Sequence, residues 1–506
     1  MRDAPAYAAV DLGAESGRVV LGRLDGARVD LEVVHRFANR PVRLPDGLRW
    51  NLLALFSETL DGLRRAAEAA PSRVLAGVGD DAWGVDYALL DAGRRVLGLP
   101  FHYRDGRTDG MVARAHERVP AADLYAVTGI QTMPINTVFQ LLADEGSEAL
   151  AAAERIALVP DLISLWLTGE LRNEATAAST TGLLDARTGG WARGIAERLG
   201  LPAAPFAGET TEPGATIGAV LGHHADAAGG AAGAPVHAVA GHDTASAYAA
   251  VPRRDGERAA VLSSGTWSLL GLELDAPVLD ERARAYNLTN ERGIEGTIRV
   301  LRNVMGLWLV QECRRQWAAE GGPGDYDAIN ALATEAREDV ALFDPDADGF
   351  LAPGDMPARI VATCRESGQD PPSTPGEIAR AALVSLACKY RLVLERLERA
   401  TGREVDVVHV IGGGAQAELL CRLTADVLGR RVLAGPVEAT ALGNVLVQAR
   451  AAGELGSLHD IRAAAAASTE PTEYEPAAAR DAADATYERF LDVTGLDTES
   501  DVAVEA

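Results

Sequence analysis

The sequence of 506 residues contains a single lysine, Lys389, although arginine and both acidic residues are common. This near absence excludes several kinds of enzyme. A P-loop needs the pattern GxxxxGK followed by Ser or Thr, a protein kinase needs a strand lysine against the phosphates of ATP, and a pyridoxal phosphate enzyme needs a lysine for its Schiff base. Lys389 lies in ACKYRLVLERLERA, whose apolar residues recur at helical spacing, so it suits none of these roles.

Cysteine and long apolar runs are also lacking. The four cysteines, Cys313, Cys364, Cys388 and Cys421, show no CxxC pair and no His/Cys spacing of a metal site, so neither a disulfide framework nor a structural zinc is indicated. No run approaches the ~18 apolar residues of a membrane span, and the chain does not start with a basic segment that leads into an apolar one. We therefore expect no membrane partner and a cytoplasmic location.

Positive charge is scarce relative to negative charge. Lys and Arg together number 48 against 73 Asp and Glu, which gives a net charge of −25. Binding to a nucleic acid backbone needs clustered Lys and Arg, so a nucleic acid partner is not expected. Hydrophobic residues make up 47% of the chain, and its length is over three times the roughly 150 residues expected for one domain. These values predict a globular protein with at least two domains.

Two similar hairpins occur far apart in the sequence. Short apolar runs over Ala6–Leu12, Gly17–Leu24 and Arg28–Phe37 predict an antiparallel meander with tight turns. Ala259–Leu274 again runs strand, small-residue turn, strand. A hairpin that opens each half of the chain predicts a duplicated architecture.

The segments between and after the hairpins alternate between strands and helices. Ser72–Asp80 reads as a strand and Leu52–Ala70 as an amphipathic helix, the alternation typical of a sheet flanked by helices. Residues 223–238 are rich in Gly and Ala without periodicity, so we expect a flexible surface loop there. Thr374 and Glu377 form a capping-box pattern that predicts a long helix through Ala400. The tail after Ala463 is expected to form one helix.

The turn between the first two strands is a candidate phosphate site. Asp11 stands at the end of the first strand, and small residues follow it up to Gly17. The backbone amides of such a turn can converge on phosphate oxygens, and Asp11 can hold Mg²⁺ directly or through water. An ordinary hairpin turn is the alternative. The matching turn Ser264–Gly265–Thr266 favours the functional interpretation, because two such turns could hold one triphosphate from opposite domains.

A glycine-rich turn near the C-terminus allows two interpretations. Residues 411–417, IGGGAQA, stand between a strand and a helix, as in a dinucleotide-binding turn. The next strand, Arg431–Pro436, carries no Asp or Glu to hold a ribose, which disfavours a dehydrogenase. Close approach of an adenine or a phosphate to the glycines explains the turn better, and a purely structural turn is the remaining alternative.

Acidic residues mark two further candidate sites. Asp243 follows a strand and opens a small-residue helix, where it can cap the helix or act as a general base on a hydroxyl. Residues 80–87, DDAWGVDY, combine carboxylates with a tryptophan and a glycine, as expected where polar hydroxyls are recognised against a flat apolar face, and solvated loop acids are the alternative. Residues 344–355 resemble the start of an EF-hand loop, but Asp355 at position twelve and Pro353 within the loop disfavour calcium.

Taken together, these motifs resemble the FGGY family of carbohydrate kinases, over nearly the whole chain. The resemblance is carried by residues 9–19 (AVDLGAESGRV), 81–91 (DAWGVDYALLD), 99–108, 128–142, 158–170, 240–247 (AGHDTASA), 263–271 (SSGTWSLLG), 299–317 (RVLRNVMGLWLVQECRRQW) and 411–444. The strings DLG, GHDTAS and SGTW are shared broadly in the family. WGVD and RNVMGLWLVQ are similar to its rhamnulose branch.

The resemblance implies a fold and a set of site residues. The implied fold is α/β: a two-domain, duplicated ribonuclease H-like (actin-like ATPase) fold with an interdomain cleft, with a sugar-binding domain over 1–248 and a nucleotide-binding domain over 249–490. The implied proton acceptor is Asp243. The implied sugar contacts are Gly84, His242, Asp243, Thr244 and Asn303, to which we add Asp86 from the acidic cluster. The implied ATP contacts are Ala14, Glu15, Ser16, Gly17, Arg18, Thr266, Gln311 and Gly413, and we assign Mg²⁺ to Asp11 and Asp243.

The implied reaction is the phosphorylation of L-rhamnulose by ATP, with Mg²⁺ bridging the phosphates, in rhamnose catabolism. A kinase for another ketose or polyol, such as fuculose or xylulose, is the nearest alternative. An actin-like ATPase without a sugar substrate is a further one, although it leaves AWGVD and Asp243 unexplained. We expect a monomer or a homodimer.

Overall fold

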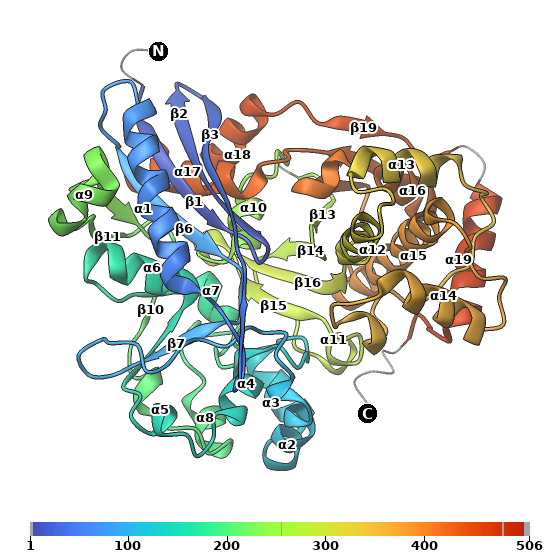
Figure 1. The fold of residues 1–506 in the computed structure, drawn as a ribbon, viewed down its shortest axis with the longest axis horizontal. Coiled ribbons are helices and arrows are strands. Elements are labelled where there is room, and N and C mark those ends of the chain that lie inside the picture. The colour runs from blue at the N-terminus through green and yellow to red at the C-terminus, as the bar shows by residue number, and fades with distance from the viewer. Residues whose placement is uncertain (1–3, 255, 478–479, 500–506) are drawn as a thin grey trace.

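The computed structural model describes residues 4–254, 256–477 and 480–499. Figure 1 shows two halves, each built around a twisted sheet, with the first half of the chain on the left and most of the second on the right. The order of strands in the two sheets is the feature that defines this architecture.

The first sheet has the order β3-β2-β1-β6-β12-β11. Its strands are β1 (Ala6–Leu12), β2 (Ser16–Asp25), β3 (Arg28–Ala38), β6 (Gly77–Ala82), β11 (Thr216–Ala219) and β12 (Pro235–His237). Strands β1, β2 and β3 form the predicted antiparallel meander, while β6 runs parallel to β1 and β12 parallel to β6. An antiparallel edge strand, β11, completes the sheet.

The second sheet repeats this pattern. Its order is β15-β16-β14-β13-β17-β18-β19. Its strands are β13 (Ala259–Ser264), β14 (Trp267–Leu274), β15 (Thr289–Arg292), β16 (Ile298–Met305), β17 (Val407–Ile411), β18 (Arg431–Ala434) and β19 (Thr472–Tyr474). Here β13, β14 and β16 form the antiparallel meander, β17 and β18 follow in parallel, and β19 is the antiparallel edge. The repeated order confirms the duplicated ribonuclease H-like fold.

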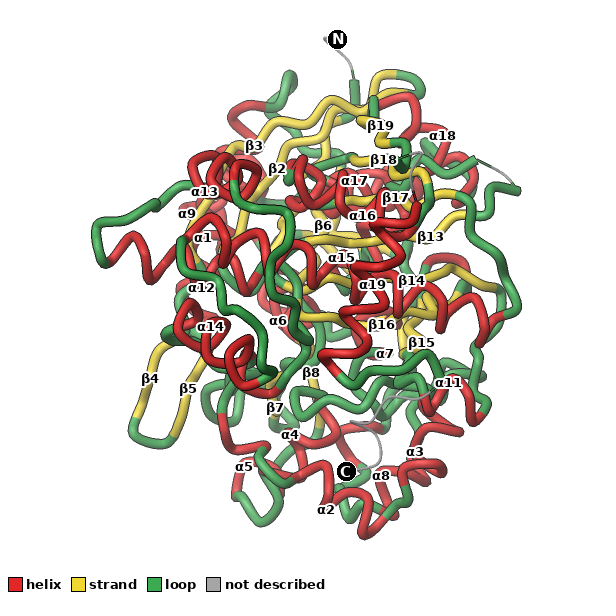
Figure 2. Tube along the Cα trace, turned by 90° about the vertical axis from the view of Figure 1, so that its right-hand side faces the viewer, coloured by secondary structure: helices red, strands yellow, loops and turns green. Residues whose placement is uncertain are grey.

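Helices cover both sheets, and short strand pairs extend from the first half. The helices up to the second hairpin are α1 (Leu52–Ala69), α2 (Met111–Arg118), α3 (Ala121–Thr128), α4 (Thr137–Ala143), α5 (Glu148–Ala151), α6 (Val159–Thr168), α7 (Ala175–Ser179), α8 (Arg193–Arg198), α9 (Ala225–Ala228) and α10 (Asp243–Ala249). Those that follow are α11 (Glu281–Ala285), α12 (Trp308–Ala319), α13 (Tyr326–Glu335), α14 (Met356–Glu366), α15 (Pro375–Thr401), α16 (Glu418–Leu428), α17 (Ala439–Ala451), α18 (Leu458–Ser468) and α19 (Arg480–Thr494). The short strands are β4 (Val42–Leu44), β5 (Gly47–Arg49), β7 (Tyr87–Leu90), β8 (Arg155–Leu158), β9 (Asn173–Glu174) and β10 (Thr210–Thr211). Figure 2 shows the β4–β5 hairpin projecting from the body of the molecule.

The two halves meet where α10 and α17 cross, and these helices follow β12 and β18, the corresponding strands of the two sheets. A Cβ atom at Gly443 of α17 would lie 1.8 Å from the carbonyl oxygen of Ser246 in α10, so only glycine permits this crossing. The next residue, Asn444, donates from Nδ2 to the Asp81 carboxylate at 2.6 Å. Part of the second half of the chain therefore packs on the first sheet and holds one of its acidic residues.

Three local predictions were wrong. Residues 222–231 form short helical turns, because Ala228 and Ala231 are buried under α1. The tail after Ala463 is divided between α18, the edge strand β19 and α19, since the extended segment 472–474 pairs with β18. The strand predicted from Ser72 begins at Gly77. Among the residues that the structure describes, no helix has both the length and the apolar character needed to cross a membrane.

Candidate active site

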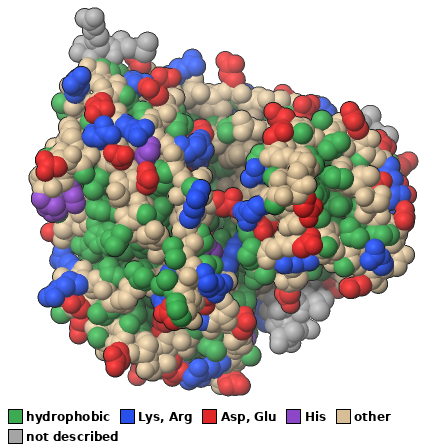
Figure 3. Space-filling view, in the orientation of Figure 1, with side chains coloured by type: hydrophobic (Ala, Val, Ile, Leu, Met, Phe, Trp, Pro, Cys, Tyr) green, Lys and Arg blue, Asp and Glu red, His purple; other side chains and the backbone are tan. Residues whose placement is uncertain are grey.

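A cavity of about 370 Å³ lies between the two halves. Its walls come from the turn after β1, the segment after β6, the start of α10, the turn between β13 and β14, and the glycine turn after β17. Figure 3 shows the hollow between the halves, with acidic and basic side chains at its rim. The parallel pairs β1–β6 and β13–β17 both end here, so the duplication brings the turns that follow these strands to one place.

Most of the predicted site residues line this cavity. They are Asp11, Ala14, Glu15, Ser16, Arg18, Gly84, His242, Asp243, Thr244, Thr266, Asn303, Gln311 and Gly413. The structure does not bring Gly17 or Asp86 into the lining. Gly17 lies on β2 beyond the turn, and Asp86 is buried behind the wall.

Asp86 is surrounded by hydrogen-bond donors of the protein itself. Its carboxylate accepts from Trp50 Nε1 at 2.5 Å, Trp83 Nε1 at 3.0 Å, Gln140 Nε2 at 2.8 Å and Tyr103 N at 3.2 Å. Since Trp83 and Tyr103 both line the cavity, Asp86 acts on the site by fixing these aromatic residues.

Three carboxyl groups, those of Asp11, Asp81 and Asp243, converge where β1 and β6 end and α10 begins, and we call this group the acidic edge. Asp11 on β1 and Asp81 on β6 are direct neighbours in the parallel register, and Ala82 forms a bridge with His242, the residue before Asp243. Burial, followed by the nearby charge of Asp11, raises the pKa of Asp81 well above its ordinary value. Close packing of like charges makes this edge a place where an added cation would be stabilised.

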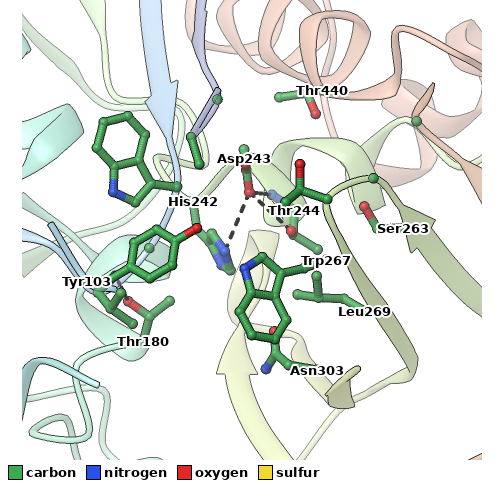
Figure 4. A pocket seen from close by; sticks show the side chains of 18 of the residues that line it. Tyr103, Thr180, His242, Asp243, Thr244, Ser263, Trp267, Leu269, Asn303 and Thr440 are labelled. Carbon is green, nitrogen blue, oxygen red and sulfur yellow. Dashed lines mark hydrogen bonds and ion pairs between the residues drawn. The ribbon is translucent and has the colours of Figure 1, made fainter. Parts of the chain in front are cut away.

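Asp243 is the first residue of α10 and points into the cavity, as Figure 4 shows. One carboxylate oxygen accepts from Thr244 N at 2.5 Å and from Thr244 Oγ1 at 3.1 Å, and lies 3.5 Å from His242 Nε2. Burial raises the pKa of Asp243 above its ordinary value, His242 opposes the shift and Asp11 adds to it. A carboxyl group with a raised pKa in a cleft suits a general base, since its proton affinity is increased.

Arg18 is a cation in contact with the acidic edge. Its guanidinium lies 2.7 Å from Asp11 Oδ2 and 2.7 Å from Glu438 Oε2, and thus joins the first hairpin to the start of α17. An arginine that borders the cavity offers a further positive group to an anionic ligand.

The opposite wall is formed by backbone that an anion could approach closely. Gly412 has φ of 80°, and a Cβ at Gly414 would lie 2.0 Å from Ser264 Oγ, so the glycine turn packs directly on the second hairpin. Gly13, Gly265, Gly412 and Gly413 all line the cavity, which leaves main-chain groups accessible on both sides. Such turns hold phosphate without lysine.

The remaining part of the cavity combines aromatic, aliphatic and amide side chains. Figure 4 shows Tyr103 on the side of the first half and Trp267 with Asn303 on the side of the second, with His242 between them. Asn303 Nδ2 donates to Gln131 Oε1 at 3.0 Å, which fixes the amide across the two halves. Val85, next to Gly84, has φ of 67°, a strained conformation for a β-branched residue and typical of functional sites.

Comparisons with known proteins agree with this geometry. The model of the N-terminal domain of the FGGY family of carbohydrate kinases matches residues 6–249, and the model of its C-terminal domain matches residues 260–452. The chain belongs to the FGGY family of carbohydrate kinases. The fold agrees with the structure of gluconate kinase from Lactobacillus acidophilus, with a TM-score of 0.77, 15% identity and coverage of 97% of this chain and 98% of that one.

Two relatives are much closer in sequence to this FGGY kinase. The rhamnulokinase of Bacteroides thetaiotaomicron is 41% identical over 458 residues, which cover 90% of this chain and 93% of that protein. The rhamnulokinase of an Enterobacter species is 40% identical over 461 residues, which cover 90% and 91%. ATP is the phosphoryl donor that membership of a family of sugar kinases implies.

The acidic edge of this FGGY kinase fits a divalent cation. Asp11 and Asp243 supply hard carboxylate oxygens of the kind that Mg²⁺ prefers. Asp81 Oδ1 is buried without a hydrogen-bond donor within the described part of the chain, which is consistent with a positive partner nearby.

Sequence reasoning missed several residues of the lining. Glu291 and Thr289 on β15, Gln131, Tyr103 and Trp267 all border the cavity. Trp267 is the last residue of the string SGTW, and Glu291 stands in an ordinary strand sequence, TNER. Gln131 and Tyr103 lie in segments that match the family, so those segments were the available signal.

Proposed function

We propose that the protein transfers the γ-phosphoryl group of ATP to the primary hydroxyl of L-rhamnulose, giving L-rhamnulose 1-phosphate and ADP. The observation that carries the proposal is the position of Asp243, in a cavity bordered by both hairpin turns and by the glycine turn. The rhamnulokinases at about 40% identity support this choice of sugar.

The residues that line the cavity support a 6-deoxy ketose. They include the apolar side chains of Val85, Ile130, Met133 and Ile135 as well as polar groups such as His242. A methyl group gains free energy from burial against such side chains, about 0.8 kcal/mol per buried CH₂, whereas a hydroxyl there would lack partners. Rhamnulose offers a methyl group at one end and a primary hydroxyl at the other.

In the proposed mechanism, the carboxylate of Asp243 accepts the proton of the sugar's primary hydroxyl. The hydroxyl oxygen attacks the γ-phosphorus, the bond to the β-phosphate oxygen breaks, and ADP leaves. The backbone of the turns at 13–16, 265–266 and 412–413 and the guanidinium of Arg18 face the region where negative charge must be held. Most of the acceleration therefore comes from orientation and electrostatic stabilisation.

Asp11 and Asp243 would hold Mg²⁺. When bound, the cation neutralises charge on the phosphate oxygens. The proposal also places Ala14, Ser16, Thr266 and Gln311 on the nucleotide. It includes a cytoplasmic location, where ATP is supplied, and a monomer or homodimer as the working unit.

A coupled assay of ADP release tests the proposal. L-Rhamnulose, L-fuculose, D-xylulose and a non-deoxy ketohexose are compared at equal concentration, with a sugar-free control. We expect kcat/KM to be highest for L-rhamnulose. A higher value for another ketose would refute the choice of sugar, and ADP release that is indifferent to every sugar would support an actin-like ATPase instead.

A further inference from the structure

The second half of the chain supplies two charged residues that lie behind His242. Glu291 on β15 and Arg299 on β16 are directly opposite each other in the antiparallel register. Both side chains are buried, at 6% and 0% exposure, and their charged groups are 3.1 Å apart. This pair lies at the edge of the second sheet that faces the start of α10.

The pair contacts the ring of His242. Glu291 Oε2 and Arg299 Nη2 each lie 3.2 Å from His242 Nδ1. The other ring nitrogen, Nε2, lies 3.5 Å from the carboxylate of Asp243. A continuous series of polar contacts therefore runs from the second sheet, through the imidazole, to the proposed general base in the first half.

The chemistry of Glu291 favours an ionised acceptor at this position. Burial raises its pKa, but the charge of Arg299 and the contact with His242 outweigh this effect and leave the pKa below its ordinary value. The ionised carboxylate holds the guanidinium of Arg299, and Arg299 Nη2, which can only donate, hydrogen-bonds His242 Nδ1 as the acceptor. The proton of the neutral imidazole then lies on Nε2, the ring nitrogen that faces the carboxylate of Asp243.

Arg299 is itself fixed to β15, the strand that carries Glu291. Its Nε donates to the carbonyl oxygen of Arg292 at 3.1 Å, which ties it to β15. Thr289 Oγ1 lies 3.5 Å from Glu291 Oε1, on the same face of the strand. With both oxygens of Glu291 near fixed groups, the carboxylate has little freedom to leave the imidazole.

We propose that Glu291 is a positioning residue for phosphoryl transfer: it holds Arg299, which fixes the ring and tautomer of His242 and thereby orients the acceptor hydroxyl at Asp243. The inference rests on the proposed function, because its readout is turnover with a sugar. Because Glu291 and Arg299 belong to the second half of the chain and His242 to the first, the site is complete only when the two halves are in contact.

The test compares Glu291→Gln with a matched variant, Glu273→Gln. Glu273 is on β14, is opposite Arg299 on its other side, and has the same side-chain exposure of 6%. Its ion-pair partners are Arg462 and Arg253, not His242. We expect Glu291→Gln to lower kcat about 10- to 100-fold, the range typical of groups that orient a catalytic residue, with the KM for ATP unchanged. We expect Glu273→Gln to change kcat less than twofold.

The comparison of kcat with the melting temperature separates positioning from a purely structural role. We expect Glu291→Gln to lose kcat at an unchanged melting temperature, because the contacts that it removes act on the orientation of His242. A fall in kcat that only follows a lowered melting temperature would mean a structural role only.

A double-mutant cycle with His242→Asn decides whether Glu291 acts through the imidazole. We expect Glu291→Gln to have no further effect on kcat in the His242→Asn background, whereas independent effects would multiply and overturn the proposal. Glu291→Asp keeps the negative charge but shortens the side chain that holds Arg299 against Nδ1, and it replaces Glu291→Gln in the cycle if that variant does not fold. Wild-type kcat in the folded Glu291 variants would also refute the inference. If the wild-type enzyme prefers a different ketose, the choice of L-rhamnulose fails, and the same comparison on that ketose still decides the role of Glu291.

Discussion

The single lysine offers a sharp test of how the second half is held together. Lys389 on α15 is 1% exposed, and its Nζ lies 2.8 Å from Asp344 Oδ1 and 3.2 Å from Asp346 Oδ2. Asp346 also accepts from the backbone N of Met305 at 2.7 Å, at the end of β16 and next to the turn that carries Thr266. In Lys389→Met, both carboxylates lose this cation.

The size of the effect follows from the surroundings of the three groups. Breaking a buried ion pair by removing one partner destabilises a protein by about 3–5 kcal/mol. The two carboxylates keep 23% and 19% exposure, so water can reach them and the lower end, about 3 kcal/mol, is expected. For a unit of 150–250 residues this is a fall in melting temperature of roughly 6–12 °C.

Arg258→Met is the matched control. Arg258 also joins two carboxylates, Glu404 and Asp406, both at 2.6 Å, but its side chain is 53% exposed. Exposed pairs contribute about 0–1 kcal/mol, so we expect a much smaller shift in the same scanning-calorimetry assay. If the melting temperature of Lys389→Met lies within about 2 °C of that of Arg258→Met, the reasoning that burial makes the ion pairs of Lys389 more stabilising than exposed ones is refuted.

Two further predictions concern the buried carboxyl group of Asp80 and the glycines Gly443 and Gly413. Burial raises the pKa of Asp80 to about 7, against one hydrogen bond from Ser164 that lowers it, so the wild type should lose stability as pH rises from about 4 to about 7. Asp80→Asn should remove this loss and melt higher than the wild type at pH 8 but not at pH 5; equal pH dependence of the two melting temperatures would contradict this. Gly443→Ala should destabilise the protein, because its Cβ would lie 1.8 Å from the Ser246 carbonyl oxygen, whereas at Gly413 a Cβ meets nothing within 4 Å. Gly413→Ala should therefore leave the melting temperature within about 1 °C while raising the KM for ATP, and the opposite ranking of the two variants in calorimetry would show the packing argument to be wrong.

Local sequence signals were enough to predict the repeated hairpins. The strands predicted at 6–12, 17–24 and 28–37 correspond to β1, β2 and β3, and the second hairpin corresponds to β13 and β14. Alternating apolar residues and tight turns are properties of adjacent residues, which is why they could be recognised. Asp243 could likewise be placed at a strand-to-helix junction, and the structure has it as the first residue of α10.

Contacts between distant segments could not be predicted in this way. The acidic run at 344–346 resembled a calcium loop, and only the fold brings Lys389 to it and gives it a structural explanation. Asp86 was assigned to the substrate because of its neighbours in sequence, yet four donors from other segments surround it. Glu291 gave no signal, since its importance depends on a cross-strand partner and on His242 in the other half of the chain.

The measurement that tests the central claim most directly is the turnover of Asp243→Asn with ATP and L-rhamnulose. Asparagine keeps the shape of the side chain and can still accept from Thr244, but it cannot take the proton of the sugar hydroxyl. We expect kcat to fall by at least about 10²-fold, while the melting temperature and ATP binding stay close to those of the wild type. Turnover close to that of the wild type, in a folded variant, would contradict the assignment of Asp243 as the general base and with it the mechanism proposed for this cleft.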